Sequence, residues 1–196
     1  MKLTLIYEGP LKGNSAGTDE KGAIRHALSP QLSNFWQGTE FLRDWKNPEY
    51  WLPTDYEGLS LSQALANEHL KYGVRFVPLA FKKLNLKCRL KITLLAAQNQ
   101  FTLMTSGDLD NRVKTLVDGL HIPASEQEMS DFLKSQYKEA PLYCLMADDD
   151  QITEFSVRQE VLWSATQEDF HKGIVKAIIE AEVYPALVTI DGTVFL

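Results

Sequence analysis

The 196-residue chain lacks the motifs of several common classes of functional site. Its only cysteines, Cys88 and Cys144, have no CxxC spacing, which argues against a disulfide framework and suits a reducing compartment. His69, His121 and His171 have no zinc-finger spacing relative to either cysteine. There is no glycine-rich phosphate loop and no GxSxG nucleophile elbow, which argues against a P-loop nucleotidase or an α/β-hydrolase.

Long apolar runs are also missing. No stretch approaches the roughly 18 apolar residues of a membrane-spanning helix. The N-terminus has too few apolar residues before Glu8 to form the hydrophobic core of a secretory signal. The sequence therefore predicts a soluble, cytoplasmic protein with no membrane partner.

Acidic residues are absent from one long segment of an acidic chain. A net charge of -6 and a pI near 5.3 would argue against a nucleic-acid partner if the charge were evenly spread. However, residues 71–107 contain no Asp or Glu. The basic residues in this segment are Lys71, Arg75, Lys82, Lys83, Lys87, Arg89 and Lys91.

Strand and helix patterns alternate along the chain. Strands are expected at residues 3–7, 88–94 and 155–157, with a loop at 9–22 and a hairpin at 186–196. Helices are expected to begin at Ser29-Pro30, at Ser60 or Ser62, at Asn111, at Ser125 and at Thr166, the last continuing to Pro185. The mixture predicts one α+β domain over residues 1–196, with helices packed on a mixed sheet.

The expected strand at 88–94 has one apolar and one basic face. Lys87, Arg89 and Lys91 point to the same side, and no acidic residue nearby in the sequence cancels their charge. They are either the solvated face of a half-buried strand or contacts for DNA phosphates. Lys21 and Arg25, in the loop expected after the first strand, are further candidates for DNA contact.

The segment GDLDNRVKTLVDGL, residues 107–120, combines carboxylates with a lysine at regular spacing. If the backbone is extended up to Asp110, the carboxylates of Asp108 and Asp110 point to one side. Lys114 and Asp118 then follow Asp110 at intervals of four on one face of the helix. A helix cap explains a single aspartate at such a position but not two aspartates and a lysine.

A second acidic segment, ADDDQI, covers residues 147–152. Taken alone, three aspartates are typical of a solvated turn. Two carboxylates from one segment and a third from another, however, make an oxygen-ligand site suited to Mg²⁺ or Mn²⁺. Such a site can activate water for phosphodiester hydrolysis, and a lysine can offset charge on the phosphate.

At these residues the sequence resembles the RusA family of Holliday junction resolvases. The resemblance consists of an Asp-x-Asp-Asn before a helix, a lysine four residues on, an aspartate four later, and then Asp-Asp-x-Gln. The residues that carry it are Asp108, Asp110, Asn111, Lys114, Asp118, Asp148, Asp149 and Gln151. It implies metal-binding catalytic aspartates at Asp108, Asp110 and Asp149, where Gln151 favours Asp149 over its two neighbours, and a catalytic lysine at Lys114.

The resemblance further implies a Mg²⁺-dependent homodimer that nicks opposing strands of a four-way DNA junction symmetrically. Residues 121–147 are longer than the family's usual connection, and we expect them to form a helical insertion beside the site. Two other functions remain open: a nuclease for flaps, forks or other branched DNA, and a non-catalytic DNA-binding protein.

Overall fold

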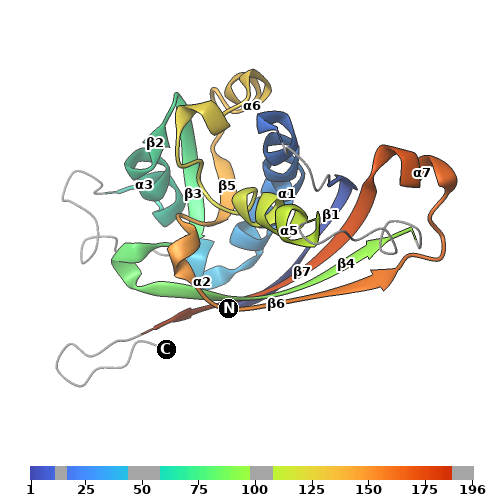
Figure 1. Ribbon diagram of the computed structural model, residues 1–196. Coiled ribbons are helices and arrows are strands. Elements are labelled where there is room, and N and C mark those ends of the chain that lie inside the picture. Colours follow the sequence, from blue (N-terminus) through green and yellow to red (C-terminus); the bar gives the residue numbers. More distant parts are fainter. Residues whose placement is uncertain (12–16, 44–57, 98–107, 187–196) are drawn as a thin grey trace.

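The chain folds as a mixture of helices and two β-sheets, which confirms the α+β class (Figure 1). A computed structural model describes residues 1–11, 17–43, 58–97 and 108–186, with the side chain of Asp108 excepted. The hairpin expected at residues 186–196 lies almost entirely outside the described residues, as do Trp45 and Trp51.

The larger sheet contains four strands in the order β1, β7, β4, β6. The first three are antiparallel neighbours, and the edge strand β6 is parallel to β4. The strands are β1 (Lys2–Pro10), β7 (Ile174–Pro185), β4 (Leu86–Ala96) and β6 (Ile152–Val161). In β4 the apolar positions from Cys88 to Leu94 are buried whereas Arg89 and Lys91 are exposed, which confirms the expected strand period.

The smaller sheet has the order β2, β3, β5, and its last two strands are parallel. Its strands are β2 (Leu70–Lys71), β3 (Val74–Ala80) and β5 (Leu142–Met146). A 3₁₀ turn, η3 (Lys82–Leu84), joins β3 to β4, and another, η5 (Asp149–Gln151), joins β5 to β6. Because β3 pairs with β5 and β4 pairs with β6, the two turns come to lie side by side.

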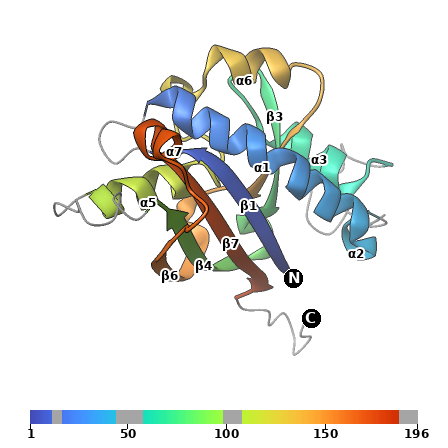
Figure 2. The same cartoon turned by 90° about the vertical axis from the view of Figure 1, so that its right-hand side faces the viewer.

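Helices cover the inner face of the larger sheet and surround the smaller one (Figures 1 and 2). The helices are α1 (Thr18–Gly38), α2 (Glu40–Arg43), α3 (Leu61–Glu68), α5 (Asp108–Asp118), α6 (Asp131–Gln136) and α7 (Gln167–Lys172), with a further 3₁₀ turn η4 (Glu126–Glu128). The long α1 contacts β1 of one sheet and β5 of the other. Its buried residues, among them Ile24, Leu28 and Trp36, therefore join the two sheets into one core.

The helix expected from Thr166 to Pro185 is wrong over most of its length. Thr166 does cap a helix, but α7 ends at Lys172, and Gly173 adopts a left-handed φ of 65°. The residues beyond form β7, which lies between β1 and β4 in the sheet. The segment is apolar at nearly every position, so it satisfies a helical period and a strand period together, and its many isoleucines and valines favour the strand.

The helix start expected at Ser29-Pro30 is also wrong, because α1 begins at Thr18 and contains Pro30. The loop expected at 9–22 therefore ends at Gly17. Ser29 is buried, and its hydroxyl accepts a hydrogen bond from the backbone N–H of Tyr143 at 3.0 Å. Packing of α1 against β5 overrides the local signal for a helix start.

The segment 121–147 is not a helical insertion beside the site. It contains α6, but it ends in β5, whose five residues are all buried. The helix cap expected at Ser125 belongs instead to Ser130, whose hydroxyl accepts from the backbone N–H of Leu133 at 3.3 Å. The segment therefore supplies part of the core, because β5 pairs with β3 along its length.

Both cysteines lie in the core as free thiols. Burial raises the pKa of Cys88 to about 12 and also raises that of Cys144. Because only a thiolate attacks thiol reagents, we expect neither thiol of the native protein to react with a disulfide reagent near pH 8. Unfolding should release both thiols, and fast reaction of the native protein would contradict this core assignment.

The tryptophans differ in environment. Trp36 is buried in the core, whereas Trp163 is 82% exposed and does not belong to it. None of the helices in the described ranges has both the length and the apolar character needed to cross a membrane.

Candidate nucleic-acid and metal site

Helix α5 carries the first acidic segment. Leu116 and Leu120 are buried, and Gly119 lies so close to Ile24 of α1 that a larger residue would collide there. The helix already begins at Asp108, so the extended backbone expected up to Asp110 is wrong. Residues two apart share a side on a strand but not on a helix.

The outward face of α5 is polar. Asp110, Asn111 and Lys114 are exposed, and the structure gives Lys114 no ion pair with any described side chain. Asp118 does not pair with Lys114, because its carboxylate lies 2.6 Å from the Lys21 ammonium. The ammonium group of Lys114 is therefore available to an external anion.

Gln151 holds the second acidic segment in its turn. Its buried side chain accepts hydrogen bonds through Oε1 from the backbone N–H groups of Ala147 and Asp148, at 2.9 and 3.0 Å. Its Nε2 donates to the Leu86 carbonyl at the start of β4, at 3.1 Å. The glutamine thus fixes the three aspartates relative to the larger sheet.

Lys82 occupies the neighbouring turn and binds two of the three aspartates. Its Nζ lies 3.3 Å from Asp148 Oδ2 and 2.7 Å from Asp150 Oδ2. Burial alone would raise the pKa of Asp148, but the hydrogen bond and charge of Lys82 outweigh burial and lower it. Asp149, between them, is exposed and has no ion pair with a described residue.

Lys82 was not recognised from the sequence as part of the site. It is 66 residues from Asp148 along the chain, and only the pairing of β3 with β5 and of β4 with β6 brings their turns together. The one available signal was its place in the basic segment without acidic residues.

The C-terminal end of α5 lies beside the strand that leads to the second acidic turn. The Leu120 carbonyl, just beyond the C-terminal end of α5, accepts from the backbone N–H groups of Leu145 and Met146, at 3.0 and 3.2 Å. Asp149 follows these residues directly, whereas Asp110 lies about 12 Å further along the helix axis from Asp118. Both views show the start of α5 away from the turn at residue 150 (Figures 1 and 2).

The predicted metal site includes Asp108, whose side chain lies outside the described part of the structure. The side chains that the structure describes, which do not include that of Asp108, contain no group of three His, Cys, Asp or Glu residues placed to hold a metal ion. The residue types of the two acidic segments suit a hard divalent cation.

Lys21 and Arg25 lie in α1 and not in the expected loop. Both belong to α1, and Arg25 is buried, donating to the backbone carbonyls of His121 at 3.1 Å and Asp118 at 2.6 Å. Lys21 pairs with Asp118 and with Glu128, at 2.6 and 3.3 Å. Both side chains anchor the residues around α5 to α1, so their prediction as DNA contacts is wrong for Arg25 and disfavoured for Lys21.

Two of the three basic residues of β4, Arg89 and Lys91, form ion pairs with adjacent strands, whereas Lys87 donates to the Asp150 carbonyl at 3.2 Å. Arg89 pairs with Glu154 of β6 and Glu182 of β7, both at 3.4 Å, and its guanidinium lies 4.3 Å from the ring centroid of Tyr184. Lys91 pairs with Glu180 at 3.1 Å. The expectation of an uncancelled positive field is therefore wrong, because adjacent strands place acidic partners that are distant in the sequence.

These pairs change what the basic face is expected to do. Replacing Lys87, Arg89 and Lys91 together with Gln should change the slope of log affinity against log salt for duplex DNA by less than about one unit. Charges already paired within the protein release few counterions when DNA binds. Binding measured over a range of salt concentrations tests this, and a slope flattened by about two to three units would show direct phosphate contact.

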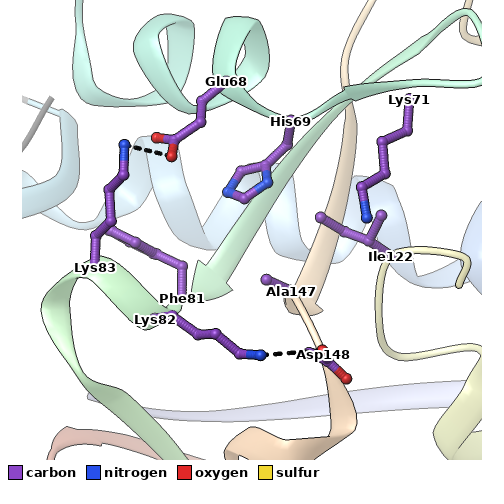
Figure 3. A pocket seen from close by; sticks show the side chains of 9 residues that line it. All are labelled: Glu68, His69, Lys71, Phe81, Lys82, Lys83, Ile122, Ala147 and Asp148. Carbon is purple, nitrogen blue, oxygen red and sulfur yellow. Dashed lines mark hydrogen bonds and ion pairs between the residues drawn. The ribbon is translucent and has the colours of Figure 1, made fainter. Parts of the chain in front are cut away.

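A cavity of about 200 Å³ lies beside the second acidic turn (Figure 3). Lys83 binds Glu68 Oε1 at 2.5 Å, and the other carboxylate oxygen is buried with no hydrogen-bond partner among the described residues. Burial lowers the pKa of His69, and Glu68 offsets only part of this effect. Three lysines (Lys71, Lys82 and Lys83) and two carboxylates (Glu68 and Asp148) line the cavity, so its lining has one more positive than negative charge.

The chain was compared with protein-family models, with curated proteins and with solved structures. No family model matches the chain, and neither the curated proteins nor the solved structures include a protein that matches it.

Proposed function

We propose that this chain is a Mg²⁺-dependent, structure-selective DNA endonuclease of the RusA type, acting on four-way junctions as a homodimer. The observation that carries the proposal is the exposure of Asp149 beside Asp148 in the second acidic turn. Lys82 pairs with Asp148 and Asp150, Gln151 fixes the turn, and the middle carboxylate of the three is exposed.

The outward face of α5 supports the same function. Asp110 presents a carboxylate in the first turn, and Lys114 presents an ammonium group one turn later with no described acidic partner. A lysine in this state can lie against a non-bridging phosphate oxygen and offset the negative charge that grows on it during hydrolysis. Carboxylates of this kind suit Mg²⁺, and Mn²⁺ can replace it.

A panel of DNA substrates tests the proposed selectivity. The protein is incubated in Mg²⁺ with a four-way junction, a flap, a fork and a linear duplex of matched sequence, and the initial rates are compared. We expect the junction to be cut fastest, with nicks on two opposing strands. Faster cutting of the flap or fork would indicate the other branched-DNA nuclease, and binding without cutting would indicate a non-catalytic DNA-binding protein.

A further inference from the structure

Three of the four edge strands of the two sheets are covered or very short. At the outer edge of β1, the side-chain amide of Gln31 on α1 binds both backbone groups of Ile6. The Ile6 N–H donates to Gln31 Oε1 at 2.9 Å, and Gln31 Nε2 donates to the Ile6 carbonyl at 2.7 Å. Helix α1 also covers the edge of β5, where the Ser29 hydroxyl accepts from the Tyr143 N–H. The edge strand β2 has only two residues.

The fourth edge strand, β6, is open along its length. Among the described residues, its backbone pairs only with β4, and Figure 1 shows it along the outside of the larger sheet. None of its ten residues is buried, and none is a proline. Proteins usually protect a long edge strand, because its unpaired N–H and C=O groups can pair with another chain. The backbone of β6 is therefore available to a further strand.

We propose that β6 is the contact through which two copies of the chain associate. The strand pairs antiparallel with the same strand of the second copy, and Ser156 lies opposite its own counterpart on a two-fold axis perpendicular to the sheet. The larger sheets of the two subunits then join into one continuous sheet. This interface rests on the homodimer of the proposed function but does not depend on the cutting of DNA.

The charges of β6 are complementary to themselves in this register. Glu154 lies opposite the partner's Arg158, and the two-fold axis repeats the pair on the other side of Ser156. Both side chains are exposed to solvent, Glu154 by 71% and Arg158 by 62%. An axis at Glu154 or at Arg158 would instead place like charges directly opposite each other, which destabilises a strand pair. Charge complementarity therefore selects a second copy as the occupant and Ser156 as the centre.

The apolar residues of β6 match in the same register. Phe155 and Val157 lie on the face of the strand opposite to Glu154, because neighbouring side chains alternate. Phe155, which is 43% exposed, lies opposite the partner's Val157. Pairing of the two strands therefore covers two aromatic rings that are exposed in a single chain, and the loss of this apolar surface from water favours the dimer.

A disulfide across the axis tests the register. Ser156→Cys places two exposed thiols about 5 Å apart between Cα atoms, within the range of a disulfide, and mild oxidation should link nearly all subunits in pairs. Thr153→Cys is the matched control on the same strand. Its two copies are offset by six residues, or about 20 Å, so it should remain unlinked. Equal linking of both variants, or a dimeric Ser156→Cys protein that does not link, would overturn the interface.

Charge reversal tests the same contact without a covalent bond. Glu154→Arg and Arg158→Glu each place like charges opposite each other twice per dimer, so each should raise the dissociation constant of the dimer by about 10-fold or more. The double variant Glu154→Arg/Arg158→Glu restores opposite charges across the axis and should return the dissociation constant to within about 3-fold of the wild type. Sedimentation equilibrium measures the constants.

The double variant also excludes an effect within one chain. Glu154 pairs with Arg89 at 3.4 Å and Arg158 with Glu160 at 3.1 Å, and both of these pairs are lost in the double variant. Recovery of the dimer can therefore come only from contact between the two copies of β6. Single variants that dimerise like the wild type, or a double variant as weak as the single ones, would contradict the proposal.

These measurements separate the interface from the nuclease activity. A wild-type dimer that links through Ser156→Cys but does not cut junctions would leave the interface intact and refute the proposed function. A junction-cutting dimer that does not link would refute the interface alone. A wild-type chain that stays monomeric at micromolar concentration would refute both the interface and the homodimer.

Discussion

Asp110→Asn is expected to abolish junction cleavage while leaving junction affinity within a few-fold of the wild type. The substitution removes one negative charge from an exposed position in the first turn of α5 and keeps the size of the side chain. Because Asp110 has no described structural partner, folding should be unaffected, and the loss should fall on cation binding. Single-turnover kinetics measure the cleavage rate, a binding titration measures the junction affinity, and thermal unfolding measures the stability of the fold.

Asp131→Asn provides a matched control for this substitution. Asp131 is also an exposed aspartate in the first turn of a helix, α6, but it lies outside both acidic segments. The Asp131→Asn protein should cut junctions at the wild-type rate. Wild-type cleavage by Asp110→Asn would show that the acidic segment of α5 is not part of an active site.

Lys114→Ala is expected to lower the single-turnover rate by roughly 10²-fold or more, the effect of losing one electrostatic stabiliser of the transition state. The alternative, a Lys114–Asp118 surface pair, is contradicted by the structure, because Asp118 pairs with Lys21. Lys114 has an exposed side chain, so its loss should not change stability measurably. Junction affinity should change little, since a single phosphate contact contributes little to the total.

Lys172→Ala is the corresponding control, because Lys172 is an exposed helix lysine bound to Glu168 on α7. It should leave the cleavage rate unchanged. A Lys114→Ala protein that cuts at the wild-type rate would contradict the assignment of the lysine, even if Asp110 proved essential.

Local patterns predicted those elements whose sequence has one dominant period. The structure confirms the alternation of buried and exposed residues in β4 and the capping of α3 by Ser60. The prediction for segment 174–185 failed because its apolar residues satisfy a helical period as well as the alternation that β7 shows in its burial. Ser29-Pro30 failed because contacts with Tyr143, far away in the sequence, extend α1 through it.

The candidate site shows the same division. The residue types and spacing of the two acidic segments could be read directly, but their relative positions could not, because these depend on which strands pair. Arg25 was taken for a surface residue because the carbonyls that bind it follow almost a hundred residues later. The acidic partners of Arg89 and Lys91 could not be predicted either, because they lie on β6 and β7, far away in the sequence.

The most direct test of the proposed function uses one labelled substrate and the wild-type protein. A four-way junction, labelled on each strand in turn, is incubated with excess protein in Mg²⁺ and, separately, in EDTA. We expect nicks at symmetric positions on two opposing strands in Mg²⁺ and none in EDTA. An intact junction in both Mg²⁺ and Mn²⁺, or equal cutting in EDTA, would contradict a metal-dependent endonuclease.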